Sequence, residues 1–539
     1  MTNLKMFSKF FSLTALLQLV PCANGAGQQH VLKDKPTSPF DAKFAKLAKD
    51  TLELWHVPGV SIAVVDGNDT WAEGYGISSF PSTPVTPETL FCGASTTKAF
   101  TAAAMALLIS SSNYTGLSWD TPISSLIRED FVLPDLYSTE HVTIEDALSH
   151  RTGMPAHDAS YGGTNEKGEK RGVRDLVRSL RHLPLTAPLR MRFQYCNMMF
   201  VAVSHVVETL TGVGLGDFLK ENIWEPLGMK STYFDTDAAQ AAPEPFAQGY
   251  VYYEEKYQPV PYMDLYIVSG AGAVISNVLD YSKWIRAFLT TSGPLSNSDY
   301  AALKTPRTLL PTSGELSRFP QPYTGPRSYA LGWYHGVYQG YEYFGHSGGM
   351  EAFGAEVVIF PDLNYGLVSF GNTGETSNFA ILKLIYDLID EKLVIPPEKR
   401  YDWNKQNQAL LHRRNHTYYN SPQALYPSIP SPPLPLTLPL ASYTGTYTHP
   451  AYHALTLVLL NNTLHFYRDN ASWVTTFELQ HVSGEFFLAY MDSRAAPGGI
   501  FWAVRKAEFV LGSEGVVRKF GVALEVGMGE EGRIWFERV

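Results

Sequence analysis

Residues 91–100 read FCGASTTKAF, and this stretch decides how the rest of the chain is interpreted. Ser95 and Lys98 stand three positions apart, in an S-x-x-K pattern. The residues that follow, TTKAFTAAAMALLIS, are rich in Ala, Leu and Met, which predicts a helix that begins near Ser95. Residues i and i+3 share a face of a helix, so we expect the lysine amine beside the serine hydroxyl.

This arrangement can create a nucleophile. The N-terminal end of a helix favours developing negative charge and helps to depress the pKa of a nearby amine. A neutral lysine in a closed pocket can accept the proton of a serine hydroxyl. An ordinary alternative is an N-capping serine followed, one turn later, by a solvated lysine. The motif alone does not choose between the two.

Two later stretches extend the pattern. FQYCNMMF contains Tyr195 and Asn197 in a Y-x-N spacing, and GHSGG contains His346 and Gly348 in an H-x-G spacing. The order S-x-x-K, Y-x-N, H-x-G, with gaps of 100 and 151 residues, resembles the serine β-lactamase and penicillin-binding-protein family. The resemblance is closest to the class C branch with its esterase and D-aminopeptidase relatives. The flanking stretches VTIEDALSHRTGMPAHD and YALGWYHGVYQGYEYFGHSGG share it.

The resemblance covers about residues 40–395 and implies an architecture. We expect an α+β fold, with a β-lactamase/transpeptidase-like domain in which an antiparallel sheet is flanked by helices and joined by a helical subdomain. After it, ALTLVLLNNTLHFYRD alternates around turn residues, which predicts an all-β domain; this part resembles the small, barrel-like lipocalin domain that follows such catalytic domains. The expected divisions are a signal peptide at 1–25, a β-lactamase-like serine hydrolase domain at 26–400, a Pro-rich linker at 401–440 and the all-β domain at 441–539.

By position, the resemblance implies roles for the motif residues. Ser95 would be the nucleophile and Lys98 its base. Tyr195 would share the proton transfer, with its phenol held near ionisation by Lys98. Asn197 would hydrogen-bond the carbonyl region of the substrate. His150 and Asp158 lie in SHRTGMPAHD, a stretch that predicts a turn, and we expect them to have only structural roles.

The GHSGG stretch would form a wall of the same site. His346 stands where class C β-lactamases have the lysine of K-T-G, and Ser347 and Gly348 would line the substrate. The backbone N–H groups of Ser95 and Gly349 would form the oxyanion hole. A lysine is a permanent cation for the carboxylate of penicillins, whereas a histidine near neutral pH mostly is not. This departure favours esters, D-amino-acid amides or small lactones over β-lactams.

The implied reaction proceeds through an acyl-enzyme on a small-molecule acyl substrate. Release by water would make the protein an esterase, amidase or peptidase, and release by an alcohol would make it an acyltransferase that modifies a secondary metabolite. The fold can also serve as a non-catalytic binding module.

A lipase-type hydrolase is a further alternative, because Gly345 to Gly349 also match the G-x-S-x-G nucleophile elbow around Ser347. An elbow needs a helix after the serine, but EAFGAEVVIFPDL predicts a strand. The secondary structure after Gly349 therefore discriminates between the two serines.

The N-terminus predicts secretion. Lys5 and Lys9 precede a short apolar run at residues 10–20, and small residues follow up to Gly25, where cleavage would occur. A membrane anchor is the alternative, although the run is short for a span and no later run approaches ~18 apolar residues, so we expect no integral membrane segment after signal removal. N-x-S/T sequons, which indicate N-glycosylation, occur at Asn68, Asn113, Asn415, Asn461 and Asn470.

Composition restricts the partners. The formal net charge is −10 and no long basic cluster occurs, which argues against nucleic acid. No clustered His/Cys ligands predict a metal, and no cofactor is implied. Cys92 and Cys196 would remain after signal removal and could pair, although spacing alone cannot place them together. The segment 421–440 holds seven prolines and is expected to be extended and free of helix. The oligomeric state is left open.

Overall fold

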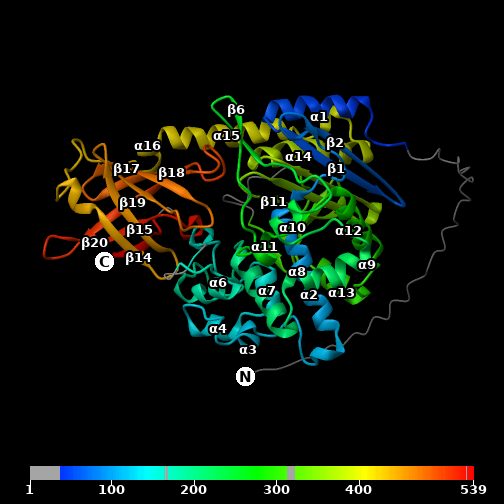
Figure 1. Cartoon of the computed structure of the whole chain (residues 1–539), viewed down its shortest axis with the longest axis horizontal. Helices are drawn as coiled ribbons and strands as arrows, with labels where there is room; N and C mark the ends of the chain where they lie inside the picture. Colours follow the sequence, from blue (N-terminus) through cyan, green and yellow to red (C-terminus); the bar gives the residue numbers. More distant parts are fainter. Residues whose placement is uncertain (1–36, 163, 165–167, 312–321, 530) are drawn as a thin grey trace, which may run out of the picture. The chain divides into compact units, whose positions relative to one another are not determined.

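The computed structural model describes residues 37–162, 164, 168–311, 322–529 and 531–539 (Figure 1). The predicted signal peptide at residues 1–25 lies outside them. The chain divides into the units Met1–Ser38 and Pro39–Val539, and the second contains all the helices and strands that are described.

An antiparallel sheet forms the centre of the larger, N-terminal domain. Within the described residues it has nine strands, in the order β3-β2-β1-β13-β12-β11-β10-β9-β8. The strands are β1 (Gly59–Asp66), β2 (Asp69–Ser79), β3 (Thr83–Pro84), β8 (Thr308–Leu309), β9 (Ser328–Tyr329), β10 (Tyr334–Tyr338), β11 (Tyr341–Gly349), β12 (Gly354–Phe360) and β13 (Tyr365–Gly371). First and last parts of the domain thus pair at its middle, where β1 lies against β13.

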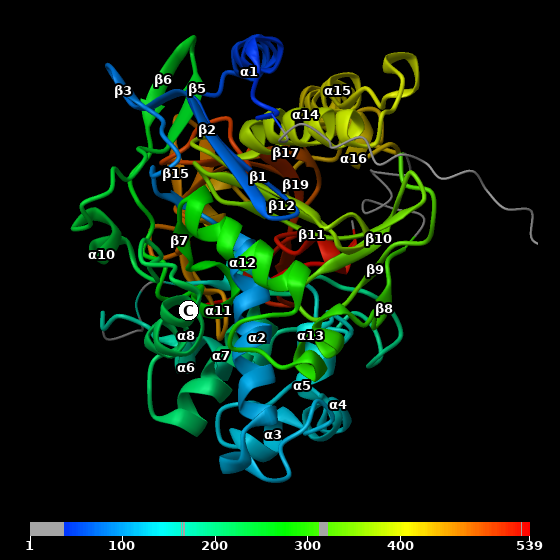
Figure 2. The same cartoon turned by 90° about the vertical axis from the view of Figure 1, so that its right-hand side faces the viewer.

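Helices cover both faces of this sheet (Figure 2). Helices α1 (Ala42–Trp55) and α14 (Glu375–Lys392) lie on one face, and α12 (Val278–Thr290) and α2 (Thr97–Ser110) lie on the other. Alternate side chains of a strand point to opposite faces, so Ile62 packs with α1 and α14 while Ala63 packs into the larger core on the α12 side. This double burial explains why GVSIAVVD is apolar along almost its whole length.

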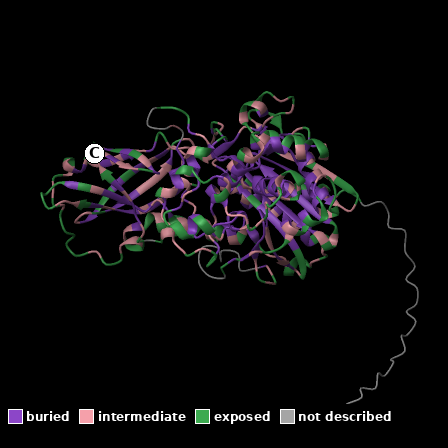
Figure 3. Ribbon diagram, turned by 90° about the horizontal axis from the view of Figure 1, so that it is seen from below, coloured by how far each residue is buried: buried purple, intermediate pink, exposed green. Residues whose placement is uncertain are grey.

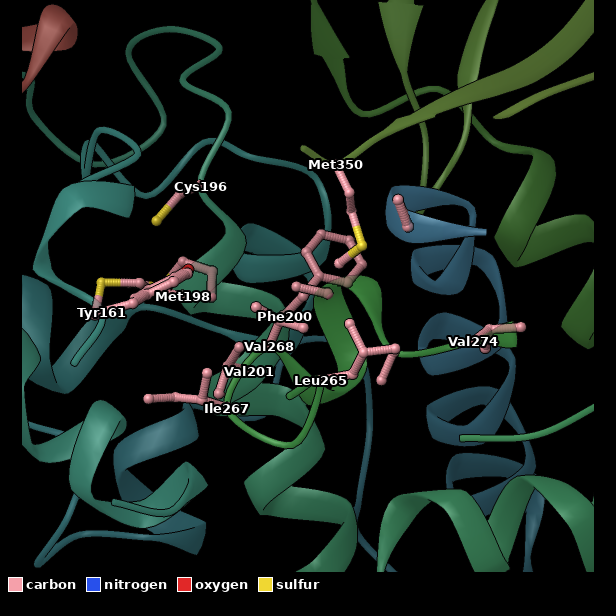
Figure 4. Packing of buried hydrophobic residues seen from close by; sticks show 14 of the residues in the cluster. Tyr161, Cys196, Met198, Phe200, Val201, Leu265, Ile267, Val268, Val274 and Met350 are labelled. Carbon is pink, nitrogen blue, oxygen red and sulfur yellow. The ribbon is translucent and has the colours of Figure 1, made fainter. Parts of the chain in front are cut away.

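A helical subdomain surrounds α2. It includes α7 (Asn197–Thr211), an apolar helix that packs against α2 and ends at Gly212 in the left-handed conformation. Figure 4 shows Phe200 and Val201 of α7 lying beside Val268, in the segment that leads into α11 (Ser269–Gly272). The remaining helices are α3 (Ile123–Leu126), α4 (Leu136–His141), α5 (Ile144–Leu148), α6 (Val173–Ser179), α8 (Leu215–Leu219), α9 (Glu225–Leu227), α10 (Thr236–Gln240) and α13 (Asn297–Lys304).

Two small two-stranded sheets complete the domain. Strand β4 (Phe91–Cys92) pairs with β7 (Ile275–Ser276), and β5 (Tyr250–Tyr253) pairs with β6 (Lys256–Pro259). The β4–β7 pair ties the residues immediately before Ser95 to the segment after α11. Buried side chains follow the sheet and the central helices (Figure 3).

The C-terminal domain is a closed antiparallel barrel, as expected for an all-β, barrel-like unit. Its strands are β14 (Gly445–His449), β15 (His453–Leu460), β16 (Thr463–Tyr467), β17 (Thr475–Ser483), β18 (Phe486–Ser493), β19 (Ala503–Leu511), β20 (Val517–Val522) and β21 (Ile534–Arg538). Aromatic rings fill its interior, for example Phe466 stacked on Phe477 at a centroid distance of 4.2 Å. The α+β architecture followed by a barrel is therefore confirmed.

The connection between the domains, expected as a Pro-rich linker at 401–440, contains two helices. Helix α15 (Trp403–Tyr419) packs on α14, and α16 (Ser421–Leu425) reaches β19 of the barrel. The prediction that residues 421–440 hold no helix is wrong at their start. Pro422 stands in the first turn of α16, where a missing N–H breaks no helical hydrogen bond.

Within the described residues no single helix combines the length and hydrophobicity of a membrane span. The helices of one bent pair, Asn197–Thr211 and Leu215–Leu227, reach that threshold only together.

A buried carboxylate holds the turn after α5. The side chain of Asp146 is fully enclosed and accepts hydrogen bonds from Arg151 Nε at 2.6 Å and Arg190 Nη2 at 2.7 Å, and with Thr143 it forms a capping box. Burial acts to raise the pKa of Asp146, but the hydrogen bonds from Arg190, Thr143 and Arg151 outweigh it and hold the pKa below its ordinary value. The next turn carries His150, which reaches the site described below.

We expect Asp146→Ala to destabilise the protein by about 2 to 3 kcal/mol, because it leaves two guanidinium groups without their shared carboxylate. Urea-induced unfolding followed by tryptophan fluorescence measures the loss. The matched control is Asp50→Ala, which removes an exposed ion pair with Lys46 on α1 and should leave the midpoint unchanged. Equal midpoints for both variants would contradict the importance of the buried network.

Candidate active site

Ser95 occupies a short, strained turn at the entrance to α2. A 3-10 turn, Ala94–Thr96, precedes the helix, and Ala94 has a φ of +47°, which an L-residue adopts only at a cost. Ser95 is partly exposed whereas its neighbours on both sides are buried. The turn therefore presents one hydroxyl to the outside of an otherwise closed core.

Two groups converge on this hydroxyl. Lys98 Nζ and the phenol of Tyr195 each donate a hydrogen bond to Ser95 Oγ at 2.9 Å. The three residues come from positions separated by up to 100 residues in the chain. The solvated-lysine alternative for the S-x-x-K motif is wrong, because Lys98 is 0% exposed.

Burial changes the chemistry of the lysine. Lys98 Nζ also donates to the carbonyl oxygen of Ala271 at 2.8 Å and lies 4.8 Å from the centroid of the Tyr195 ring. Burial lowers the pKa of Lys98 to about 7, against the opposing attraction of Asp158. A large share of this amine is therefore neutral at physiological pH and can accept a proton.

Tyr195 behaves differently from expectation. Burial is the main cause that raises the pKa of Tyr195 well above its ordinary value, so the phenol is neutral and acts as a donor. The expectation that Lys98 holds it near ionisation is wrong, because burial penalises the charged phenolate and so raises the pKa of Tyr195.

His150 fixes the backbone on both sides of Tyr195. Its carbonyl oxygen accepts from Gln194 N at 2.8 Å, its Nδ1 accepts from Cys196 N at 3.0 Å, and its ring centroid lies 4.3 Å from that of Tyr195. Burial lowers the pKa of His150 well below its ordinary value, so the ring stays neutral and Nδ1 remains an acceptor. The expected structural role of His150 thus includes orienting the tyrosine.

Asn197 is the first residue of helix α7 and lies two residues after Tyr195 in the chain. Its Nδ2 donates to Asp158 Oδ1 at 3.1 Å, and its Oδ1 is buried without a hydrogen-bond partner among the described residues. A buried acceptor without a partner costs free energy unless a ligand supplies a donor. Asn197 is therefore placed to receive an N–H or O–H group.

The sequence analysis did not predict that Asp158 accepts a hydrogen bond from Asn197. Burial raises the pKa of Asp158 to about 6, while the hydrogen bond from Asn197 and the charge of Lys98 act in the opposite direction. The residue lies in a turn rich in Gly and Pro, and no spacing relates it to Asn197, so only the tertiary contact reveals the link.

His346 lies behind the site and carries no charge. It is 2% exposed, its Nδ1 donates to the carbonyl oxygen of Ser347 at 2.6 Å, and its Nε2 accepts from the phenol of Tyr329 at 2.9 Å. Burial and then the charge of Lys98 lower the pKa of His346 to about 3. Both ring nitrogens are therefore engaged, and the position of the K-T-G lysine is held by a neutral group.

The glycines of β11 allow the strand to touch the Ser95 turn. A Cβ on Gly348 would lie 2.3 Å from the carbonyl oxygen of Gly93, so only glycine fits there. Asn378 Nδ2 holds this strand by donating to the carbonyl oxygens of Gly348 at 2.9 Å and Ala355 at 3.0 Å. The close approach brings the backbone of Gly349 to the turn that carries Ser95, as an oxyanion hole requires.

Ser347 is not an elbow nucleophile. Strand β12 follows Gly349 after a short turn, and no helix begins between them in this described stretch. Side chains alternate along β11, so Ser347 points to the opposite face from Gly348, which contacts the Ser95 turn. The lipase-type interpretation is therefore wrong.

Other predicted features lie apart from this cluster. Cys92 and Cys196 are both buried and free, so the disulfide that was considered between them does not form. Within the described residues no group of three His, Cys, Asp or Glu residues could hold a metal ion. The asparagines of the five sequons, Asn68, Asn113, Asn415, Asn461 and Asn470, are exposed.

Comparisons with known proteins agree with this geometry. The family model described as Beta-lactamase matches residues 44–389, and the model described as Domain of unknown function (DUF3471) matches residues 430–538. Two relatives are named Unguisins hydrolase. That of Aspergillus campestris is 44% identical over 506 residues, which cover 93% of this chain and 92% of the relative. That of Aspergillus violaceofuscus is 42% identical over 532 residues, which cover 94% and 92%.

Solved structures share the fold at lower identity. The octameric penicillin-binding protein homologue from Pyrococcus abyssi aligns with a TM-score of 0.57 and 20% identity, over 92% of this chain and 99% of that chain. The D-amino acid amidase from Ochrobactrum anthropi SV3, in complex with L-phenylalanine amide, aligns with a TM-score of 0.52 and 22% identity, over 65% and 98%.

The position of Lys98 predicts a pH dependence. We expect labelling of Ser95 by a fluorophosphonate to accelerate as the pH rises through about 7 and then to level off, because the neutral amine that accepts the serine proton is populated above its pKa. Labelling rates measured between about pH 5 and pH 9 test this. Lys98→Arg, which stays protonated, should slow labelling by about 100-fold or more at every pH. A rate that is flat across the range would contradict the assignment.

Proposed function

The chain belongs to the Beta-lactamase family, and from that premise we propose that it is a serine hydrolase that forms an acyl-enzyme on Ser95 with a small-molecule ester or amide. One observation carries the proposal: a fully buried lysine with a lowered pKa and a neutral tyrosine both donate hydrogen bonds to the hydroxyl of Ser95, the one partly exposed residue of a strained turn. Such a set serves proton transfer at a nucleophile and has no evident structural purpose.

The geometry supports a sequence of proton transfers. Neutral Lys98 accepts the proton of Ser95 as Oγ forms a bond to the carbonyl carbon of the substrate. The N–H groups of Ser95 and Gly349 stabilise the oxyanion. Tyr195 donates its proton to the leaving group, and the lysine returns a proton to the tyrosine. Attack of water on the acyl-enzyme then regenerates Ser95, with its proton restored through the same pair.

The electrostatics of the wall favour substrates without a free carboxylate. Neutral His346 offers no cation, and Asp158, with a pKa of about 6, is largely ionised at neutral pH. A substrate carboxylate would find repulsion here and not an ion pair. We therefore expect neutral esters and amides to be better substrates than penicillins, whose carboxylate needs a cation.

The relatives suggest the substrate class. Two proteins named as hydrolases of unguisins match this chain at 42–44% identity over almost its entire length. We infer that this chain hydrolyses an acyl bond of an unguisin or of a compound of that class. The N-terminal pattern and the exposed sequon asparagines support a secreted glycoprotein.

We expect the purified protein to convert an unguisin to a product that has gained one water, observed by liquid chromatography and mass spectrometry. Ser95→Ala should abolish conversion, and Ser347→Ala, an exposed serine on the opposite sheet face, is the matched control and should retain it. A fluorophosphonate should label the peptide that contains Ser95 in the wild type and in Ser347→Ala. Activity or labelling that depends on Ser347 would overturn the proposal. Labelling of Ser95 without conversion would retain the hydrolase and exclude this substrate.

Glycosylation is tested separately. We expect a peptide-N-glycosidase to reduce the apparent mass of the protein secreted by a fungal host, because the five asparagines are exposed and can carry glycans. Mass spectrometry of the treated peptides locates the deamidated asparagines. Retention of the protein inside the cell, with unmodified sequons, would contradict secretion.

A further inference from the structure

The barrel contacts the larger domain at described residues 155–162 and at Thr164, next to the candidate active site. The backbone N of Ser472 donates to the carbonyl oxygen of Tyr161 at 2.9 Å, and the rings of Tyr161 and Trp473 stack at 5.3 Å. A Cβ on Gly527 would lie 2.5 Å from that of Pro155, so the loop between β20 and β21 touches the start of this stretch. The interface is thus formed by the same turn that carries Asp158.

A barrel carboxylate is inserted into this turn. Glu525 is 5% exposed, and its Oε2 accepts from the backbone N of His157 at 2.5 Å. Its Oε1 accepts from Gly527 N at 2.6 Å, which fixes the carboxylate within its own loop. A buried carboxylate is expensive to desolvate unless its oxygens accept hydrogen bonds, and one of these bonds is made to the larger domain.

A second barrel group holds the same residue. The phenol of Tyr452 lies 2.7 Å from Nδ1 of His157, and Nε2 of His157 lies 2.9 Å from the carbonyl oxygen of Pro184. A carbonyl only accepts, so Nε2 carries the proton and Nδ1 accepts from the phenol. His157 has a φ of +48°, a strained conformation that such surrounding contacts must maintain.

The restrained residue leads directly to the site. Asp158 follows His157 in the chain and accepts the hydrogen bond from Asn197 Nδ2. That bond turns Oδ1 of Asn197, which has no partner among the described residues, away from Asp158. The contacts from the barrel therefore run through His157 and Asp158 to Asn197. Asn197 follows Tyr195, which donates to Ser95 Oγ, by two residues.

We propose that the barrel takes part in catalysis through positioning: Glu525 and Tyr452 fix the backbone at His157, so that Asp158 orients the amide of Asn197 beside Ser95. This inference rests on the proposed function and assigns a role to the domain of unknown function. Glu525 and Tyr452 are positioning residues, since neither contacts Ser95, Lys98 or Tyr195 in the hydrogen bonds described.

A double-mutant cycle separates positioning from mere stability. We measure kcat and KM with a p-nitrophenyl ester for Glu525→Gln, for Asp158→Asn and for the double variant. Glutamine keeps the shape but turns an NH2 group toward a backbone N–H. If Glu525 acts through Asp158, the Glu525→Gln substitution should reduce kcat/KM by about tenfold in the wild type and by less than about twofold in the Asp158→Asn background.

A second variant and a control distinguish loss of positioning from loss of folding. Tyr452→Phe removes one hydroxyl and leaves the aromatic packing, so it should show the same dependence on Asp158 if Glu525→Gln does not fold. His453→Phe keeps a ring but removes another contact between the domains, in which Nε2 of His453 accepts from Arg171 Nη1 at 2.5 Å, and it should leave kcat/KM unchanged. All variants are first compared by thermal unfolding.

The outcomes are distinguishable. Loss confined to the wild-type background, with the control unaffected, supports positioning. Equal losses in both backgrounds, an equal loss in His453→Phe, or full activity in both Glu525→Gln and Tyr452→Phe would overturn it. A wild type that neither hydrolyses the ester nor accepts the fluorophosphonate on Ser95 would instead overturn the proposed function, and with it this inference.

Discussion

The enclosure of the Lys98 amine is the constraint on which the arrangement of the larger domain depends. A lysine that is 0% exposed is unfavourable unless its amine is hydrogen-bonded and can lose its charge. The fold meets both conditions by closing α7 and α11 around the start of α2. Close approach requires small residues, and a Cβ on Gly270 would lie 2.8 Å from Thr101 Oγ1. Gly332, with a φ of +76°, similarly packs against the backbone of Lys98, where a Cβ would lie 2.7 Å from its carbonyl oxygen. Some of the stretches that flank the motifs thus enclose the Lys98 amine and exclude water from it.

Local sequence revealed the reacting groups better than their ionisation. Ser95 and Lys98 share a helical turn, so their contact follows from spacing alone. Tyr195 joined them only through the order of motifs, because its contact spans 100 residues. The expected ionisation of the Tyr195 phenol was wrong, because it depends on burial, and burial is set by the tertiary structure and not by the residue type. The same reason explains His346, which was expected to line the substrate but is enclosed by Tyr329 and its own strand.

The misjudged parts of the fold have a comparable origin. In α15 the sequence WNKQNQALLHRRNHTYY is mostly polar and lacks a clear apolar stripe, so its helix depends on packing against α14. In α16 a proline-rich context concealed a helix whose proline lies in the first turn. The barrel was predictable because strands that alternate around turn residues signal themselves locally. The contacts of the barrel with the larger domain could not be predicted, because Glu525 and His157 are separated by 368 residues.

These observations give one electrostatic account of the site. The cation nearest the nucleophile is a lysine whose burial favours its neutral form, and the group at the K-T-G position is a histidine held neutral by two hydrogen bonds. Asp158, largely ionised at neutral pH, adds negative potential near Asn197. A β-lactam site must attract a carboxylate, whereas this one is organised to avoid presenting a fixed cation. The selectivity for neutral acyl compounds that we propose agrees with this arrangement, because burial removes charge from both Lys98 and His346 and leaves no permanent cation there for a substrate carboxylate. In this proposal a single property, the low polarity around Lys98, both activates Ser95 and sets the preference for uncharged substrates.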